Sequence, residues 1–225
     1  MIIFIQARFN SNRLPGKVLM NLAGKPMLQW TIERLKTSIK SIPIAVITSD
    51  TKSDDVINSF CHNLGIKCYR GDLNNVAIRF RNACKNFGHK EFIRICGDSP
   101  LIDPCLIQTA INLKKEVSAD IITNLYPRTF PKGQSVEIVS LSSIDLILDQ
   151  DLTKEEKEHV TIAFYKRFNH LFNIYNFSAK RKIYSNLQLS VDTKIDFDRL
   201  DYVLSKYPKL KDSSWLDIAN VISRL

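Results

Sequence analysis

The sequence Ile2-Ile-Phe-Ile-Gln-Ala-Arg-Phe-Asn-Ser-Asn-Arg-Leu-Pro-Gly-Lys17 joins a short apolar run to a polar loop that carries three cations. The apolar run, residues 2–6, predicts a buried strand. In the loop, Gly16 allows close approach of the backbone, and Pro15 limits flexibility. A cationic loop directly after a strand favours a phosphate-binding site in an α/β protein.

This loop has the fixed donors and cations that a triphosphate needs, because crowded negative charge must be compensated. The nucleotide-binding candidates are Gln6, Ala7, Arg8, Ser11, Arg13 and Lys17, of which the three cations, Arg8, Arg13 and Lys17, are also the catalytic candidates. The P-loop spacing G-x-x-x-x-G-K-[ST] is absent, and so is the G-x-G-x-x-G of dinucleotide oxidoreductases. The alternative is a basic surface loop without a ligand.

Strands and helices alternate through the first half of the chain. Apolar runs predict further strands at 43–48, 66–70, 92–96 and 120–123. Helical spacing of apolar residues predicts helices around 27–35, 56–64, 77–84 and 106–111, the second opened by the cap candidates Ser53 and Asp54. This order predicts an α/β fold with a mostly parallel, Rossmann-like sheet flanked by helices. The loops after residues 6 and 96 then share one ligand-binding edge.

The pattern changes after Tyr126, where prolines and a glycine interrupt it. Strands are expected at 135–139, 171–177 and 187–191, a helix at 155–168, and two closing helices near 195–205 and 214–223. We expect one nucleotide-binding domain over residues 1–225. Within it, 126–180 is the candidate for a small β/α extension or dimer arm.

The composition is that of a globular protein, with 225 residues, 44% of them hydrophobic and 24% charged. The net charge of +9 is compatible with a nucleic acid, a membrane surface or a small polyanionic substrate. The one uninterrupted basic run, Lys180-Arg181-Lys182, is short, so a solvated loop is favoured.

Location and redox state follow from absences in the sequence. The apolar runs are too short to cross a bilayer and the N-terminus lacks a signal-peptide pattern, so we expect a cytoplasmic protein. Five cysteines without a CxxC pair predict buried, reduced thiols rather than zinc or disulfides.

An acidic motif, Cys96-Gly-Asp-Ser-Pro-Leu-Ile-Asp-Pro104, follows the strand at 92–96. Gly97 permits a tight turn, after which Asp98 projects at the sheet edge and can hold Mg²⁺ against phosphate oxygens. The alternative is that Asp98 caps the next helix. Asp103 fits that cap better, because Pro104 suits a first helical position.

The loop and its continuation, Leu22-Ala-Gly-Lys-Pro-Met-Leu28, resemble the start of cytidylyltransferases that activate sugar acids, such as the synthetases of CMP-linked octulosonate and neuraminate. The resemblance is strongest to the spore-coat polysaccharide cytidylyltransferase-like branch. It spans most of the chain and implies a nucleotidyltransferase sheet, CTP as substrate, Mg²⁺ as cofactor and a homodimer.

Further site residues rest partly or wholly on this resemblance. Asp192, in Val191-Asp-Thr193, ends an apolar run, and a capping arrangement of Thr193 with Asp196 leaves its carboxylate free. The resemblance implies that Asp192 is the second metal carboxylate. It also implies that Arg79 lies near the nucleobase.

Acceptor binding is expected where the pattern changes. The unusual segment 123–133 supplies Arg128 and Lys132, either of which can meet a carboxylate, and it runs on to Glu137. A structured turn is the alternative. His159 in the predicted helix at 155–168 is a structural residue or, by the resemblance, an acceptor-site residue. Arg94, on the strand before Asp98, is a candidate for contact with the base or the acceptor, and a structural ion pair is an equally good interpretation.

Together these features predict Mg²⁺-dependent transfer of CMP from CTP to the hydroxyl of an acidic sugar, with release of pyrophosphate, for surface polysaccharide or glycan synthesis. The expected partners are CTP and the sugar, with no nucleic acid and no membrane. One alternative is a nucleotidyltransferase that uses another triphosphate or a non-sugar acid, since Phe9, Asn10 and Asn12 depart from the family loop. Another is a basic nucleic-acid-binding module, which would bind oligonucleotides in a salt-sensitive way. A glycosyltransferase is not favoured, because no convincing Asp-x-Asp motif is present, and Asp196-Phe-Asp198, which fits that spacing, lies in a predicted helix.

Overall fold

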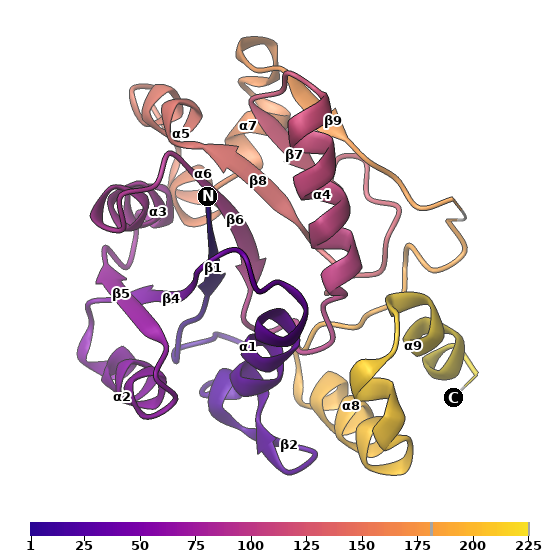
Figure 1. The fold of residues 1–225 in the computed structure, drawn as a ribbon. Helices are drawn as coiled ribbons and strands as arrows, with labels where there is room; N and C mark the ends of the chain where they lie inside the picture. The colour runs from indigo at the N-terminus through magenta and orange to yellow at the C-terminus, as the bar shows by residue number, and fades with distance from the viewer. Residues whose placement is uncertain (181, 225) are drawn as a thin grey trace.

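A seven-stranded sheet forms the centre of the described chain, with strand order β5-β4-β1-β6-β8-β7-β9 (Figure 1). The computed structural model describes residues 1–180 and 182–224. The strands of this sheet are β1 (Ile2–Gln6), β4 (Ile44–Ser49), β5 (Lys67–Gly71), β6 (Glu91–Cys96), β7 (Ile121–Thr123), β8 (Glu137–Ser140) and β9 (Ile174–Asn176). All neighbouring pairs are parallel except those of β8, which runs antiparallel to both β6 and β7. The predicted, mostly parallel α/β fold is confirmed.

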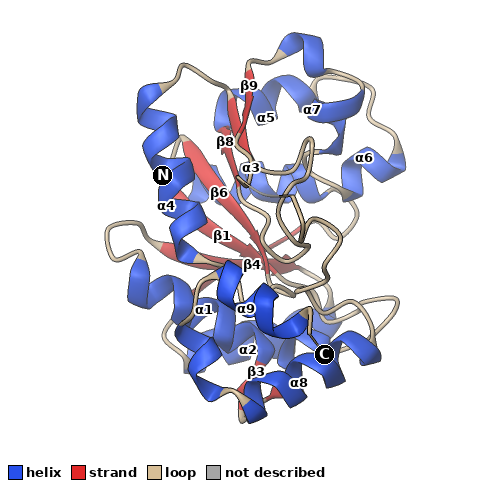
Figure 2. Cartoon of the chain, turned by 90° about the vertical axis from the view of Figure 1, so that its right-hand side faces the viewer, coloured by secondary structure: helices blue, strands red, loops and turns tan. Residues whose placement is uncertain are grey.

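Helices cover both faces of the sheet. They are α1 (Met27–Ser38), α2 (Asp55–Asn63), α3 (Val76–Asn86), α4 (Pro104–Glu116), α5 (Leu141–Leu148), α6 (Lys154–Glu158), α7 (Ile162–Lys166), α8 (Lys194–Lys206) and α9 (Trp215–Ile222). Figure 2 shows α4 on one side of the sheet and α5, α6 and α7 on the other. A small hairpin, β2 (Asn21–Leu22) with β3 (Lys25–Pro26), precedes α1.

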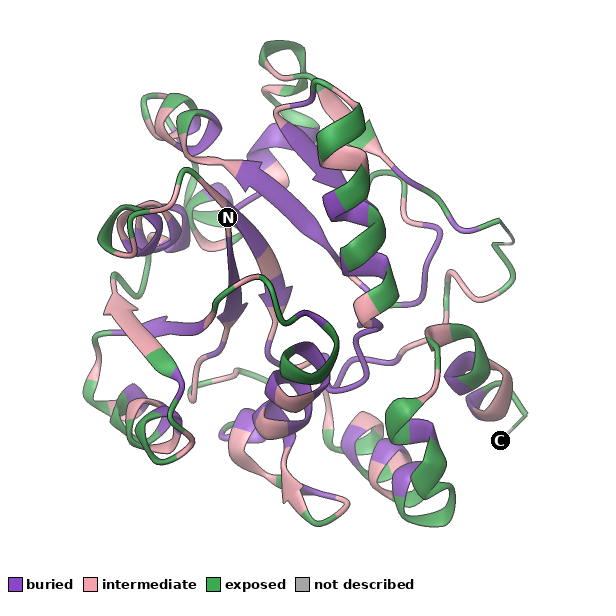
Figure 3. Ribbon diagram, in the orientation of Figure 1, coloured by how far each residue is buried: buried purple, intermediate pink, exposed green. Residues whose placement is uncertain are grey.

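Alternation along the strands divides the core in two. Ile3 and Ile5 point to the cluster shared with α1, α4 and α8, whereas Ile2 and Phe4 point to the cluster shared with α3, α5 and α7. The central strands are therefore buried on both faces, and exposed residues lie on the outer sides of the helices (Figure 3). Each large apolar side chain buried in this way stabilises the fold by about 1.5–3 kcal/mol.

Three local predictions are wrong. Residues 187–191 form no strand. Their backbone instead bonds to Lys132, whose N donates to Leu187 O and whose O accepts from Leu189 N. The helix predicted at 155–168 is split into α6 and α7 at His159, and apolar periodicity cannot reveal the break because Val160 on the far side is buried as well. Cys105 is exposed, although the other cysteines are buried or half-buried and all five are free thiols.

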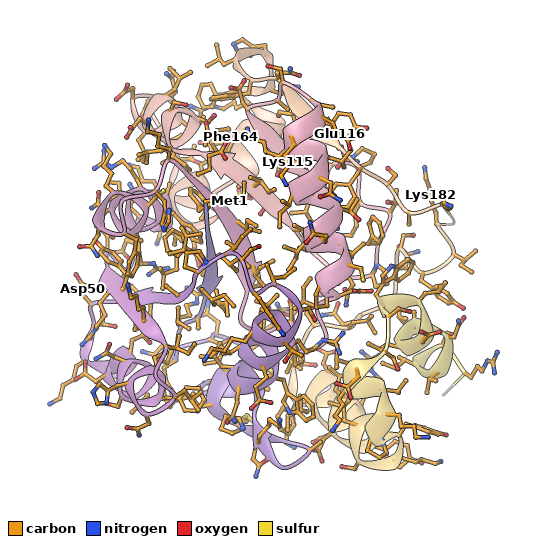
Figure 4. The ribbon with its side chains drawn as sticks, in the orientation of Figure 1. Met1, Asp50, Lys115, Glu116, Phe164 and Lys182 are labelled. Carbon is orange, nitrogen blue, oxygen red and sulfur yellow. The ribbon has the colours of Figure 1, made fainter. Side chains whose placement is uncertain are left out.

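The segment 126–180 contributes β8 and β9 to the main sheet. Its role in dimerisation stays a prediction. The basic run at 180–182 lies partly outside the described residues, because Arg181 is not described; Lys180 and Lys182 are exposed. Figure 4 shows Lys182 at the outer edge of the molecule. Within the described ranges, no helix has both the length and the apolar character needed to span a membrane.

Candidate active site

The carboxyl ends of β1, β4 and β6 meet at one edge of the sheet. The predicted phosphate-binding loop, residues 7–17, begins there and is called the phosphate loop below. The chain leaves β1 beside Gly97, whose N donates to Gln6 O at 2.8 Å. A Cβ at Gly97 would lie 2.9 Å from that same oxygen, which is closer than real Cβ contacts. Glycine at 97 thus lets the phosphate loop start beside the loop after β6, which carries Asp98.

The phosphate loop folds around the carbonyl of Phe9. This oxygen accepts from Ser11 N at 2.9 Å and from Gly16 N at 2.7 Å. Gly16 has a φ of 73°, in the left-handed region that glycine adopts without strain, and a Cβ added there would lie 3.2 Å from the Phe9 ring. The loop therefore closes on itself around the Phe9 carbonyl.

Asp54 ties this loop to the end of β4. Its Oδ1 accepts from Phe9 N at 2.7 Å, and its Oδ2 accepts from Thr48 Oγ1, Ser49 N and Ser49 Oγ. Burial alone would raise the pKa of Asp54, yet the hydrogen bonds from Ser49 and Phe9 hold it below the ordinary value. The predicted capping role is wrong, because the side chain accepts no cap bond from α2.

Lys17 joins the loop after β6, which carries Asp98, to the segment before α8, which carries Asp192. Its Nζ donates to Asp98 Oδ2 at 2.8 Å, to Val191 O at 2.6 Å and to Asp192 Oδ1 at 3.5 Å. The Lys17 side chain is 8% exposed, whereas those of Asp98 and Asp192 are 27% and 24% exposed. One buried cation thus compensates two carboxylates that remain open to the cavity.

Both carboxylates are free of capping duties, as the sequence predicts. Asp103 caps α4 by accepting from Cys105 N at 2.8 Å. Thr193 and Asp196 form a reciprocal capping box at the start of α8. Asp192 instead forms an ion pair with Arg13, with Nη2 and Oδ1 2.9 Å apart, which brings a second loop cation to the acidic pair.

These side chains line one cavity of about 520 Å³, a size usual for small-molecule sites. Its walls come from the phosphate loop, from α3, from the end of β6, from the α6–α7 turn and from Asp192. The lining residues are Gln6, Ala7, Arg8, Ser11, Asn12, Arg13, Lys17, Val18, Val76, Arg79, Arg94, Cys96, Asp98, Glu158, His159 and Asp192.

The structure therefore brings together every predicted nucleotide-binding residue, both predicted metal carboxylates and His159. Three predicted acceptor residues do not line this cavity. Lys132 is exposed, Arg128 donates to Ser135 Oγ at 3.3 Å, and Glu137 is fully buried behind Arg94. The roles themselves stay predictions.

Arg79 is the most deeply buried cation of the cavity wall, with 1% exposure. Its Nη1 donates to Asp72 O at 3.0 Å, while its Nε has no partner among the described residues. Burial lowers its pKa to about 10, so it remains charged at neutral pH. A buried, incompletely paired guanidinium at a cavity wall favours a ligand with hydrogen-bond acceptors.

Sequence reasoning missed two contributors. Asp54 shapes the phosphate loop. It follows the predicted strand at 43–48, whose carboxyl end lies at the ligand-binding edge of the sheet, and that position is the sequence feature that could have revealed it. Glu158 pairs with Arg8 at 3.2 Å across 150 residues, and no local pattern reveals that contact.

The donor set at the acidic pair fits Mg²⁺. Magnesium binds one or two protein carboxylates together with substrate phosphates and water, and Asp98 and Asp192 offer two carboxylates beside the loop that is predicted to bind phosphate. Among residues 1–180 and 182–224, no cluster of three or more His, Cys, Asp or Glu side chains offers a metal cage made by protein alone.

A larger hollow of about 670 Å³ lies between α1, the start of α4 and the turn before α9. Its buried Arg34 donates to the carbonyls of Ile102, Lys211 and Ser213. That arginine therefore anchors the C-terminal segment, and we place the chemistry at the smaller cavity.

Comparison with known proteins agrees with this geometry. A family model described as cytidylyltransferase matches residues 2–218. The chain belongs to the cytidylyltransferase family. It is a nucleotidyltransferase enzyme, as the sequence motifs indicate.

The similarity extends over relatives and solved structures. The chain is 27% identical over 230 residues to the spore coat polysaccharide biosynthesis protein SpsF of Bacillus subtilis, covering 100% of this chain and 94% of that protein. It is 28% identical over 154 residues to the 3-deoxy-manno-octulosonate cytidylyltransferase of Colwellia psychrerythraea, covering 67% of this chain and 54% of that one. A solved cytidylyltransferase from Leptospira borgpetersenii superposes with a TM-score of 0.92 at 28% identity, covering 99% of this chain and 93% of the other.

Proposed function

We propose that this cytidylyltransferase transfers CMP from CTP to a hydroxyl of an acidic sugar. The observation that carries the proposal is Lys17, which contacts both Asp98 and Asp192 within a cavity lined by the phosphate loop. Names of relatives support the substrate class, since one acts on 3-deoxy-manno-octulosonate and another serves spore coat polysaccharide synthesis. A role in surface polysaccharide or glycan synthesis, and a homodimer, belong to the same proposal.

The reaction is an in-line displacement at the α-phosphorus. The acceptor hydroxyl oxygen forms the new bond to phosphorus and loses its proton, and the bond to the departing pyrophosphate breaks with its electron pair. Arg8, Arg13 and Lys17 stabilise the negative charge on the phosphates. Asp98 and Asp192 would hold Mg²⁺, which neutralises phosphate charge when bound.

Arg79 supports a base with acceptor atoms at the edge that faces it. Cytosine carries an acceptor oxygen and an acceptor nitrogen side by side, whereas uracil replaces the nitrogen by a donor N–H. A guanidinium, which only donates, therefore favours cytosine over uracil at this position. The buried and incompletely paired guanidinium of Arg79 at the cavity wall is the observation behind this preference.

Pyrophosphate release tests the proposal. Wild-type protein with Mg²⁺ is supplied in turn with CTP, UTP, ATP and GTP, each against a panel of sugar acids that includes 3-deoxy-manno-octulosonate and a set of non-sugar acids. We expect release with CTP and at least one sugar acid. Release only with another triphosphate would reject the cytidylyl assignment, and release only with non-sugar acids would reject the acceptor class. Tight, salt-sensitive oligonucleotide binding without any release would favour the nucleic-acid-binding alternative.

A further inference from the structure

A hydrogen-bonded row of polar side chains crosses four adjacent strands and ends at the cavity. Gln6 of β1, Arg94 of β6, Glu137 of β8 and Thr123 of β7 lie on the same face of the sheet, and Tyr165 of α7 closes over them. Arg94 Nε donates to Gln6 Oε1 at 3.1 Å, and Arg94 Nη1 donates to Glu137 Oε2 at 2.5 Å. The Tyr165 hydroxyl donates to the other Glu137 oxygen and lies 3.1 Å from Thr123 Oγ1.

The row replaces apolar core residues in this layer of the sheet. Two residues earlier on β1, β6 and β7, and two residues later on the antiparallel β8, the same face carries Phe4, Phe92, Ile121 and Val139, all fully buried. Burying an ion pair in such a place rarely stabilises a fold more than apolar packing would. The position of the row beside the cavity therefore suggests a ligand rather than stability.

Each donor in the row has a determined direction. Burial and the neighbouring Glu137 raise the pKa of Tyr165 well above its ordinary value, so its hydroxyl stays protonated and donates to Glu137. Arg94 can only donate, so the Gln6 atom facing it is the oxygen, and the Gln6 amide nitrogen is left for the cavity.

At the cavity wall, the row presents donors only. Gln6 and Arg94 both line the cavity, whereas Glu137, with a side chain 1% exposed, does not. The Arg94 side chain is 14% exposed, and its Nη2 has no partner among residues 1–180 and 182–224. Arg128 lies close enough to Glu137 for the carboxylate to oppose the lowering of the arginine pKa by burial. Arg128 itself donates to Ser135 Oγ and does not line the cavity, so Arg94 is the arginine that this wall presents to a ligand.

Gln6 is also a nucleotide-binding candidate by its sequence, but its side-chain oxygen is bonded to Arg94, which groups it with this wall. The phosphate loop, Arg79 and the acidic pair form the remaining walls. We propose, resting on the function proposed above, that Arg94 and Gln6 bind the carboxylate of the acidic sugar, with Glu137 and Tyr165 as positioning residues. Arg94 matches a carboxylate because its planar guanidinium can donate two parallel hydrogen bonds.

The test uses a double variant that keeps the buried row neutral. Arg94→Met combined with Glu137→Gln removes both charges, while residue 137 still accepts from Tyr165. The substrates are the sugar acid that wild type uses and its uncharged carboxamide, with CTP binding measured by calorimetry. We expect kcat/KM to fall about 100-fold for the acid, the loss expected for a charged hydrogen-bonded pair, with little change for the carboxamide and unchanged CTP affinity.

Tyr165→Phe tests the positioning role, because it keeps the ring and removes only the hydroxyl. We expect the KM for the acid to rise about 10-fold, with kcat and the KM for CTP unchanged. A purely structural tyrosine would lower the melting temperature without moving that KM.

The outcomes separate the two proposals. If no sugar acid supports pyrophosphate release by wild type, the proposed function fails and the carboxylate site fails with it. If wild type uses a sugar acid and the double variant loses acid and carboxamide turnover equally, or weakens CTP binding, only the carboxylate site is rejected. An unchanged KM in Tyr165→Phe would reject the positioning role.

Discussion

At the phosphate loop, one lysine is shared by two carboxylates that stay partly open to the cavity, whereas on the sheet face one fully buried carboxylate is shared by an arginine and a tyrosine. The first arrangement can exchange partners when phosphates and a metal arrive, because its anions are accessible. The second cannot easily rearrange, since any change leaves a charge buried without a partner. The comparison separates a cluster suited to chemistry from one suited to orienting a ligand.

The largest effect is expected from Lys17→Met, which removes the shared cation. Turnover should fall about 10³-fold, because a preorganised charge at the phosphates is lost. Without Mg²⁺ the melting temperature should also fall, since Asp98 and Asp192 then repel each other, and added Mg²⁺ should restore part of it. Lys194→Met, at an exposed helix pair, is the control. Wild-type turnover in Lys17→Met would contradict the proposed role of the cluster.

Glu137→Gln should lower the free energy of unfolding, because it removes the carboxylate shared by Arg94 and Tyr165. Arg94 would keep its buried charge without a carboxylate, which costs about 3 kcal/mol of unfolding free energy. Urea denaturation measures the loss. Glu155→Gln, from an exposed pair with Lys166, should change stability by less than about 0.5 kcal/mol. Equal stability of the two variants would show that the buried row is already neutral or hydrated.

Asp54→Asn tests a buried carboxylate that lies in neither cluster but holds the phosphate loop in place. At pH 7 the variant should lose about 1–3 kcal/mol, because buried donors lose a charged acceptor. The folded-state pKa of Asp54 lies below its unfolded value. Its contribution is therefore fully present above the ordinary carboxyl pKa of about 4 and is lost as the pH falls through the folded-state pKa.

Stability curves of wild type and Asp54→Asn, measured by urea denaturation from pH 7 down to pH 2, check this sign. The two curves should converge toward the acid end. A gap that stays constant with pH would mean that the Asp54 charge contributes nothing.

The smallest effect is expected at the exposed pair of Arg8 with Glu158, whose side chains are 40% and 39% exposed. Glu158→Gln should change stability by less than about 1 kcal/mol. It should raise CTP affinity by about threefold, because Glu158 competes with the phosphates for Arg8. Calorimetric titration of CTP measures this, and weaker binding in the variant would contradict such competition.

The sequence predicts the first cluster well because its parts are local signals. A cationic loop follows one strand, a Gly-Asp turn follows another, and the parallel order brings strand ends to one edge. Even the capping box that leaves Asp192 free is a four-residue pattern. The cation that joins the carboxylates could not be chosen among Arg8, Arg13 and Lys17, since that depends on side-chain reach in three dimensions.

The second cluster escapes the sequence because it depends on strand register. Arg94 and Glu137 pair across 43 residues, through an antiparallel strand whose direction the alternating pattern did not indicate. Tyr165 comes from α7, beyond the break at His159 that the sequence did not predict. Asp54 was misread for a related reason, since an acid before a helix satisfies the local rule for a cap even when it serves another loop.

The most direct test of the central claim is calorimetric titration of CTP with and without Mg²⁺. The proteins compared are wild type, Asp98→Asn, Asp192→Asn and the exposed-helix control Asp198→Asn. We predict that Mg²⁺ strengthens CTP binding to wild type and control, and that either cavity variant loses this gain and Mg²⁺-dependent turnover while keeping its circular dichroism spectrum. Binding of CTP that ignores Mg²⁺ in wild type, or that keeps its Mg²⁺ dependence in both cavity variants, would contradict the account.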